Sequence, residues 1–316
     1  MNGTSKPHRP LNIVCDRAHW DFVLESYFFR EVLLGGLQRP LRIIPLEPDQ
    51  IPPSLDDLLI AGPLERLKGL IDRAIQTKAR NVGVFHMADE CFDLDRSFYP
   101  NVDYVIRNYF RADILALPQP CRCMQVLWVP NGYRHGIGAR SPQSLTPFPA
   151  RQHQFFFAGQ MNPSVEGQRE RAAMFEALQQ SRLPALVMRT DRFAAGLGPA
   201  SYSAFMENSR FALCPRGNSQ ETIRLFDAME LGAIPISLRH DFLLNPKVMG
   251  GTPIVLLDRW EQLPHWYAQA IESPDAENIW HARQTEMVQW WSAFKSHKQA
   301  EVAALIEQSF ARYQTL

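Results

Sequence analysis

Short apolar runs alternate with polar or amphipathic segments along most of the chain. The runs have the length of buried strands, and turn residues or segments of helical periodicity separate them. The predicted strands fall into two series, which are residues 11–16, 41–46, 81–87, 102–110 and 124–130, and then 153–159, 185–190, 210–215, 234–238 and 253–257. Strands that alternate with helices predict mostly parallel sheets with crossover helices, and therefore the α/β class.

The segments between the runs predict helices and one linker. Helical patterns cover residues 25–37, 55–79, 166–181, 202–209 and 219–231, and the tail from about residue 275. The segment 55–79 is predicted to be mainly helical, with a break at Gly62 and Pro63. The stretch 131–152 is rich in Gly, Pro and Ser and has little periodicity, which is typical of a linker.

These patterns predict two α/β halves of similar size. The expected domains are residues 1–135, a linker at 136–152, a second domain at 153–275 and a helical tail at 276–316. Ligands of open parallel sheets bind at the carboxyl ends of the strands. With two such sheets facing each other, we expect the site in the cleft between them.

Composition narrows the class of protein. Of 316 residues, 46% are hydrophobic and 21% are charged, which excludes a disordered chain. Lys plus Arg and Asp plus Glu number 33 each, so nothing global indicates a nucleic-acid partner. Five irregularly spaced cysteines argue against a disulfide framework and fit a reducing compartment.

Targeting signals are not evident in the sequence. The first ten residues are polar, unlike a signal peptide, and no apolar stretch has the length of a membrane span. We therefore expect a cytoplasmic protein without a transmembrane segment, and peripheral membrane association stays open.

The most informative stretch is FALCPRGNSQETIRLFDAMELGAIPISL, residues 211–238. Asn218, with Glu221 three residues on, predicts a capped helix start, and Gly232 predicts its end. The N-terminus of such a helix can bind phosphate. Arg224 and Asp227 share a face of the helix. They suit a nucleoside diphosphate, with the arginine on the pyrophosphate and the carboxylate on the ribose hydroxyls. The alternative is an ordinary surface pair, which contributes only about 0.2–0.5 kcal/mol.

This stretch resembles the signature of exostosin-like glycosyltransferases, glycosyltransferase family 47. The matching positions are Phe211, Leu213, Pro215, Gly217, Arg224, Asp227, Ala228, Gly232 and Pro235, followed by LDRW at 257–260. The family usually has Glu where this chain has Asp227, which is one methylene shorter. The resemblance implies a GT-B fold with two facing Rossmann-like domains, the second binding the nucleotide sugar, and a tail that crosses back to the first.

The resemblance also implies an inverting transferase that moves a sugar from a nucleotide diphosphate sugar, UDP-sugar being the expectation, to a glycan or polyol-phosphate acceptor. Its expected donor-binding residues are Gly159, Pro215, Arg216, Gly217, Asn218, Ser219, Arg224 and Asp227. The segments 129–136 and 155–169 resemble the last turn of a first GT-B domain and the first strand and loop of a second one.

Inversion needs a base that takes the proton of the acceptor hydroxyl. The turn after the strand 81–87 carries several acidic side chains, whose mutual repulsion could raise one pKa. Asp89 and Glu90 are the first candidates for the base, and Asp16 is the next. The residues expected on the acceptor side are His19, His86 and Arg107. For any one of these residues, a solvated loop or a helix cap is the plainer interpretation.

Three alternatives complete the prediction. Asp93-Leu-Asp95 has the spacing of a metal–diphosphate motif, but the phosphate site expected in the second domain competes with it. We therefore predict no metal ligands and no obligatory cofactor, although a divalent metal is compatible with the sequence.

A nucleotide-sugar epimerase or NAD-linked oxidoreductase is disfavoured, because no glycine-rich turn follows the first strand. A catalytically inactive scaffold of the same fold, binding nucleotide or glycan, stays open.

Overall fold

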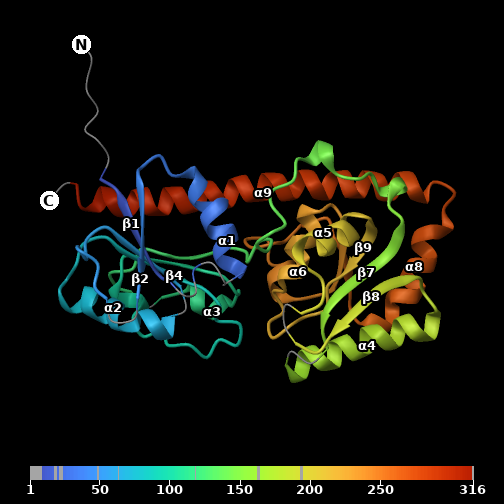
Figure 1. Ribbon diagram of the computed structural model, residues 1–316, viewed down its shortest axis with the longest axis horizontal. Helices are drawn as coiled ribbons and strands as arrows, with labels where there is room; N and C mark the ends of the chain where they lie inside the picture. Colours follow the sequence, from blue (N-terminus) through green and yellow to red (C-terminus); the bar gives the residue numbers. More distant parts are fainter. Residues whose placement is uncertain are drawn as a thin grey trace, which may run out of the picture. The chain divides into compact units, whose positions relative to one another are not determined.

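The computed structural model describes residues 9–17, 20, 24–47, 50–62, 64–117, 119–161, 164–192 and 195–314. The chain divides into two compact units (Figure 1). The first unit comprises residues 1–130 and 295–316, and the second comprises residues 131–294. The stretch after residue 130, which is rich in Gly, Ser and Pro, therefore belongs to the second unit.

Parallel strands form one sheet in the described part of the first unit, in the order β2-β1-β3-β4-β5-β6. The strands are β1 Leu11–Asp16, β2 Leu41–Leu46, β3 Leu58–Gly62, β4 Val82–His86, β5 Tyr104–Arg107 and β6 Val126–Trp128. The helices are α1 Leu24–Glu31, α2 Leu64–Gln76 and α3 Ala112–Leu115, with 3-10 turns η1 Leu33–Gly36 and η2 Tyr99–Asn101. Strands β3 and β4 are buried along their whole length, as expected for central strands of a parallel sheet.

The segment 55–79 corrects one prediction. Its first part is strand β3, and only the part after Pro63 is helical. Leu58, Leu59 and Ile60 are completely buried between β1 and β4. Burial in a sheet therefore outweighed a helical preference that was judged from the sequence alone.

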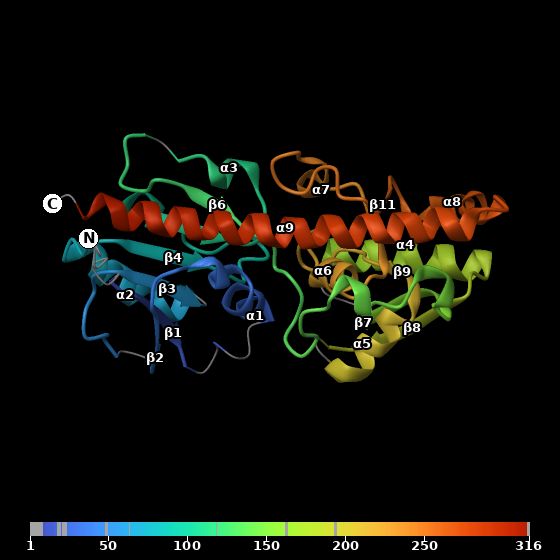
Figure 2. The same cartoon turned by 90° about the horizontal axis from the view of Figure 1, so that it is seen from above.

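The second unit also contains a parallel sheet, in the order β11-β10-β9-β7-β8. Its strands are β7 His153–Gln160, β8 Ala185–Thr190, β9 Ser209–Leu213, β10 Ile234–Leu238 and β11 Val255–Leu257. Its helices are α4 Val165–Ser181, α5 Pro199–Glu207, α6 Ile223–Glu230, α7 Asp241–Leu244 and α8 Leu263–Glu272, with 3-10 turns η3 Pro142–Ser144, η4 Phe148–Ala150 and η5 Trp260–Gln262. Helices α4 and α5 lie on opposite sides of this sheet (Figure 1, Figure 2).

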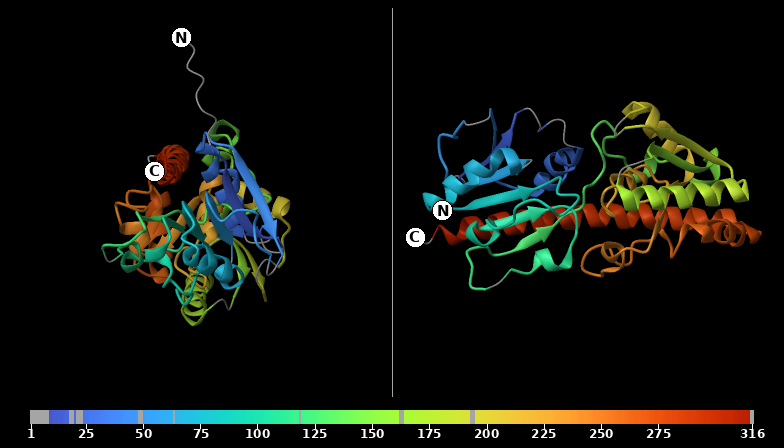
Figure 3. Two further views of the ribbon diagram at one scale, coloured as in Figure 1. Left: turned by 90° about the vertical axis from the view of Figure 1, so that its left-hand side faces the viewer. Right: turned by 90° about the horizontal axis from the view of Figure 1, so that it is seen from below.

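Helix α9, Ala276–Arg312, begins in the second unit and ends in the first. Its last turns lie beside the first sheet (Figure 2, Figure 3). There the Ser309 hydroxyl donates to Asn81 Oδ1 over 2.6 Å, and the Tyr313 hydroxyl donates to Asp103 Oδ1 over 2.7 Å. The predicted tail that returns to the first domain is thus present. These bonds are made to buried groups, so the tail is an integral part of the first unit.

The tryptophans of the tail serve mainly in packing, as predicted. Trp291 is 2% exposed, and its indole N–H donates to Glu230 Oε2 over 2.7 Å. Trp280 packs among aromatic rings of the second unit, with its centroid 5.1 Å from that of Phe211. Among the described residues, no helix combines the length and the apolarity that a membrane crossing requires.

Candidate functional site

The turn that follows β9 is the centre of the candidate site, at the carboxyl edge of the second sheet. The Trp260 indole N–H donates to Glu170 Oε1 over 3.2 Å, and the same oxygen accepts the Arg216 backbone N–H over 3.0 Å. On the other side of the turn, the Ser164 hydroxyl donates to the Gly217 carbonyl over 3.1 Å. Tryptophan of the LDRW segment therefore holds the Pro-Arg-Gly turn through Glu170 on α4.

Helix α6 begins later than predicted. It starts at Ile223, with Thr222 at the N-cap and no side-chain cap bond. The predicted capping box of Asn218 and Glu221 is therefore wrong. Glu221 instead accepts the Asn131 backbone N–H through Oε1 over 3.2 Å, a bond from a distant part of the chain. Gly232 follows the helix with φ +71°, as its predicted end requires.

Arg224 lies in the first turn of α6 and points back to strand β7. Its Nη2 and Nε donate to the Ala158 carbonyl over 2.8 and 3.3 Å, and its guanidinium lies 4.3 Å from the ring centroid of Phe157. The residue is 5% exposed, and its buried Nη1 has no hydrogen-bond partner in the described structure. A Cβ on Gly159 would approach Arg224 Nη2 to 2.4 Å. Glycine at 159 therefore makes room for the guanidinium, and the structure brings these two predicted residues together.

Two further guanidinium groups belong to this edge of the sheet. Arg171 on α4 is 4% exposed, and it donates to the Arg216 carbonyl over 3.1 Å and also to the Gln160 carbonyl. Arg216 is half-buried, and its Nε is buried without a partner. Within the described residues, none of Arg171, Arg216 and Arg224 forms an ion pair with a carboxylate.

The electrostatics of this group follow from burial. Burial, reinforced by the charge of Arg224, lowers the pKa of Arg171 to about 9. Burial also lowers the pKa of Arg224. The adjacent carboxyl of Glu170 has its pKa raised by burial. A group of buried or half-buried cations without an ion pair to a carboxylate is costly in isolation, and a bound anion would offset that cost. Arg171 was not predicted, because nothing local in its helix distinguishes it from a surface arginine.

Asp227 has a different environment from the one predicted. It is completely buried, and it accepts the Arg134 backbone N–H through Oδ1 over 2.9 Å. Its Oδ2 accepts Arg134 Nε over 2.7 Å and the Tyr202 hydroxyl over 3.1 Å. Although burial alone would lower the pKa of Arg134, the charge of Asp227 raises it. The predicted contact with a ribose would require this pairing to open.

The other predicted donor residues shape the turn. Pro215 and Ser219 are buried, and the Ser219 hydroxyl accepts the Glu221 backbone N–H over 3.2 Å. The Asn218 carbonyl accepts Arg216 Nη2 over 3.2 Å. His240, at the end of β10, is a loop histidine of the kind that sequence reasoning discounts. It is 8% exposed with a buried, unpartnered Nε2, and burial together with the charge of Arg216 lowers its pKa to about 4.

A buried polar network forms at the carboxyl edge of the first sheet. Arg107 Nη2 donates to Asp89 Oδ2 over 3.3 Å, and Arg107 Nη1 donates to the Tyr99 hydroxyl over 3.0 Å. His86 Nδ1 lies 2.6 Å from the same hydroxyl. Burial, with the charge of Arg107, lowers the pKa of His86 to about 3. The structure thus joins three predicted residues, and Arg107 pairs with Asp89, an acid of the turn that follows β4.

Of the remaining acids of this turn, Asp95 is paired with a lysine. Asp95 pairs with Lys68 over 2.6 Å, and that hydrogen bond lowers the pKa of Asp95. Glu90 is half-buried, and Asp16 at the end of β1 is 3% exposed. His19 lies outside the described residues. Across the described residues, no group of three or more His, Cys, Asp or Glu side chains has the arrangement of a metal site.

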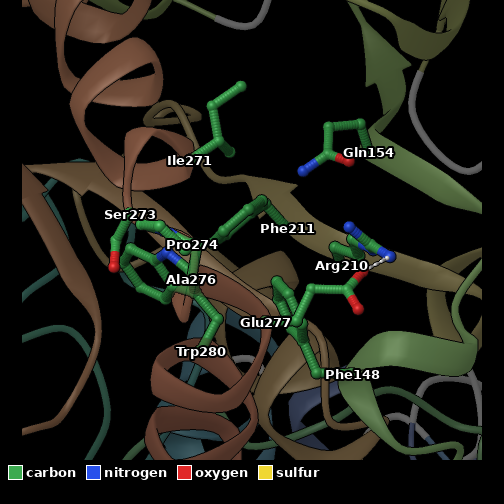
Figure 4. Close-up of a pocket in the computed structure, with 10 residues that line it drawn as sticks. All are labelled: Phe148, Gln154, Arg210, Phe211, Ile271, Ser273, Pro274, Ala276, Glu277 and Trp280. Carbon is green, nitrogen blue, oxygen red and sulfur yellow. Dashed lines mark hydrogen bonds and ion pairs between the residues drawn. The ribbon is translucent and has the colours of Figure 1, made fainter.

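A small pocket of about 180 Å³ lies elsewhere in the second unit (Figure 4). Phe211 and Trp280 line it, and an ion pair of 2.8 Å between Arg210 and Glu277 borders it. Gln154 and Arg210 stand at the first residues of β7 and β9. The pocket is therefore at the amino edge of the parallel sheet, the edge opposite the arginine group.

Comparison with known families agrees with the motif. The model of the Exostosin GT47 domain matches residues 126–277, which include β7, β9, α6 and the turn between them. These residues, just under half of the chain, are therefore similar to the exostosin GT47 domain. Ribitol-5-phosphate xylosyltransferase 1 of Homo sapiens is 24% identical to this chain over 123 residues. That match covers 35% of this chain and 27% of the human protein, so it spans only about a quarter of the human protein's length.

Solved structures extend the likeness from the exostosin domain to nearly the whole chain. T4 phage BGT in complex with its UDP-glucose substrate has a TM-score of 0.55 and 11% identity, covering 94% of this chain and 99% of the phage chain. Sucrose-phosphate synthase from Thermosynechococcus elongatus has a TM-score of 0.56 and 11% identity, covering 96% of this chain and 100% of that chain. Together with the two parallel α/β sheets and the long C-terminal helix, these likenesses identify the fold as GT-B.

Proposed function

We propose that this protein is an inverting glycosyltransferase that takes a sugar from a nucleotide diphosphate sugar, with UDP as the nucleotide. The observation that carries the proposal is the group of Arg171, Arg216 and Arg224, whose guanidinium groups form no ion pair with a carboxylate within the described structure. A diphosphate carries the charge that this group lacks, and guanidinium groups bind its oxygens in pairs.

The same arginines would act in the reaction. When the glycosidic bond to the diphosphate breaks, negative charge develops on the leaving oxygen. Fixed cations in a site with little water stabilise that charge more in the transition state than in the ground state. Arg224 is held by the Ala158 carbonyl and the Phe157 ring, so its guanidinium needs little reorganisation.

The acceptor in this proposal is a glycan or a polyol phosphate. Asp89, Glu90 and Asp16 are the three candidates for the group that takes the proton of the acceptor hydroxyl. To act as the base, Asp89 would have to keep an oxygen available beside its bonds from Arg107 and from the Leu94 backbone N–H. Replacing each by the isosteric amide tests this assignment, and the true base should lose at least about 100-fold in kcat.

Calorimetric titration with UDP tests the nucleotide site. We expect the wild-type protein to bind UDP, and Arg224→Ala to lose at least about tenfold in affinity, since a charge-assisted hydrogen bond contributes about 1.5–3 kcal/mol. Arg239→Ala is the matched control, because Arg239 pairs with the exposed Asp258 on the surface of the same unit. If neither UDP nor another nucleoside diphosphate binds the wild type, the inactive scaffold becomes the better interpretation.

A further inference from the structure

We propose that Asp227 does not contact the donor ribose but is a positioning residue for Arg134, and that Arg134 binds an anionic oxygen of the donor diphosphate. This inference rests on the proposed nucleotide site. It assigns the carboxylate and the arginine to roles that the sequence motif alone does not indicate.

The first step is the occupancy of the Asp227 carboxylate. Its two oxygens together accept three hydrogen bonds of 2.7 to 3.1 Å, and the side chain has no exposed surface. Two of those bonds come from Arg134, one from the backbone and one from Nε. Opening them for a ribose would leave the buried Asp227 carboxylate and the partly buried Arg134 charge without each other, which is unfavourable for a pair removed from water.

The second step is that the pairing fixes a whole segment. Asn131, three residues before Arg134, is held in the same way by Glu221, through its backbone N–H and through Nδ2 to the Glu221 carbonyl over 3.0 Å. Both carboxylates, Glu221 and Asp227, follow the Pro-Arg-Gly turn in the chain. Their hydrogen bonds hold the segment 131–134 against helix α6, which carries Arg224, and against the residues just before it.

The third step concerns the part of the Arg134 side chain that stays available to a ligand while Arg134 is paired with Asp227. Its guanidinium stacks 4.2 Å from the ring centroid of Tyr202, and its Nη2 donates to the Tyr202 hydroxyl over 3.3 Å. The side chain keeps 21% of its surface exposed, in contrast to Asp227 with none. The charge of Arg134 also acts on Arg224 and contributes to lowering its pKa, so the two cations share one neighbourhood. A fixed, partly exposed arginine that is bonded to Asp227 on the helix of Arg224 is suited to the anion that Arg224 binds.

Titration of four proteins with three ligands tests this assignment. The proteins are the wild type, Arg134→Gln, Asp227→Asn and the control Arg140→Gln. The control changes an arginine six residues further along the chain, whose Nη1 donates to the Ile137 carbonyl. The ligands are UDP, 2′,3′-dideoxy-UDP and uridine. The dideoxy nucleotide lacks both hydroxyls that a carboxylate could bind, and uridine lacks the diphosphate.

We expect Arg134→Gln to bind UDP at least tenfold more weakly and uridine unchanged, with Arg140→Gln close to wild type. We expect Asp227→Asn to lower the affinities for UDP and for dideoxy-UDP by the same factor, because Asp227 acts through Arg134. Arg134→Lys, which keeps the charge, should restore part of the UDP affinity, and it replaces Arg134→Gln if that variant does not fold.

Two results would overturn the assignment. A penalty for Asp227→Asn that is present with UDP and absent with dideoxy-UDP would mean that the carboxylate reads the ribose. Equal affinities of wild type and Arg134→Gln for UDP would mean that Arg134 is structural. A wild-type protein that binds no nucleoside diphosphate refutes the proposed function itself, and is thereby distinguished from both.

Discussion

Gly159→Ala should separate nucleotide binding from folding. The new methyl group would lie 2.4 Å from Arg224 Nη2, whereas ordinary contacts of a Cβ begin at 3.4 Å. The next nearest atoms, Arg224 Cζ and Phe157 Cζ, are both 3.6 Å away and need not move. The substitution therefore displaces the end of one side chain by about 1 Å and leaves the strand in place.

Gly159→Ala should weaken UDP binding more than it lowers the free energy of unfolding. Displacement breaks the hydrogen bonds from Arg224 to the Ala158 carbonyl and moves the guanidinium from the place where it would meet a phosphate. Loss of one charge-assisted bond of about 1.5–3 kcal/mol predicts UDP affinity lower by about 10- to 100-fold. Overpacking costs about 1–3 kcal/mol of stability, which the replacement of a strand glycine offsets by about 0.5–1 kcal/mol.

Calorimetry with UDP measures the affinity, and urea denaturation of the same preparation measures the free energy of unfolding. Gly198→Ala is the control, because a Cβ at Gly198 in the same unit meets nothing within 4 Å. The reasoning is refuted if Gly159→Ala binds UDP within twofold of the wild type while the wild type binds it. A variant that unfolds would instead show that the guanidinium cannot move, which contradicts the same argument.

Two further predictions concern the first unit. A Cβ on Gly83 would lie 2.1 Å from Tyr104 Cζ, so Gly83→Ala should lose about 1–3 kcal/mol in urea denaturation, whereas Gly69→Ala, in open space on α2, should lose none. Because the pKa of His86 is lowered to about 3 from 6.5, the unfolded chain binds a proton that the folded one does not. Stability should therefore fall as pH decreases from 6.5 towards 3, by up to about 1.4 kcal/mol per pH unit for this group, and His86→Gln should reduce that slope. Equal slopes for the two proteins would contradict the assignment of the buried neutral histidine.

Local sequence was sufficient where the chemistry of a position depends on its neighbours in the chain. The apolar runs at 11–16, 153–159 and 234–238 became parallel strands because their apolar side chains could be buried only against a hydrophobic layer. Gly232 was recognisable because a residue that ends a helix at positive φ is preferentially glycine. The exostosin signature was legible for the same reason, since its residues lie within one strand, turn and helix.

Charge partners were beyond the reach of the sequence, because they come from distant parts of the chain. The carboxylate of Asp227 meets Arg134, and that of Glu221 meets Asn131, each about ninety residues away. The Glu221 pairing also explains why the capping box was wrong, since its side chain serves a tertiary contact in place of the helix end. Similarly, folding placed Arg107 against Asp89, one of the candidates for the base.

The sequence by itself determined the α/β class, the two series of strands and the turn that carries Arg224. Those features follow from hydrophobic periodicity and backbone preferences, which act over a few residues. Tertiary structure decided which arginines pair with a carboxylate. Among the described residues Arg107 and Arg134 form such an ion pair, whereas Arg171, Arg216 and Arg224 do not. The physical reason is that the free energy of a buried charge is set by whatever side chains the fold brings within a few ångströms of it.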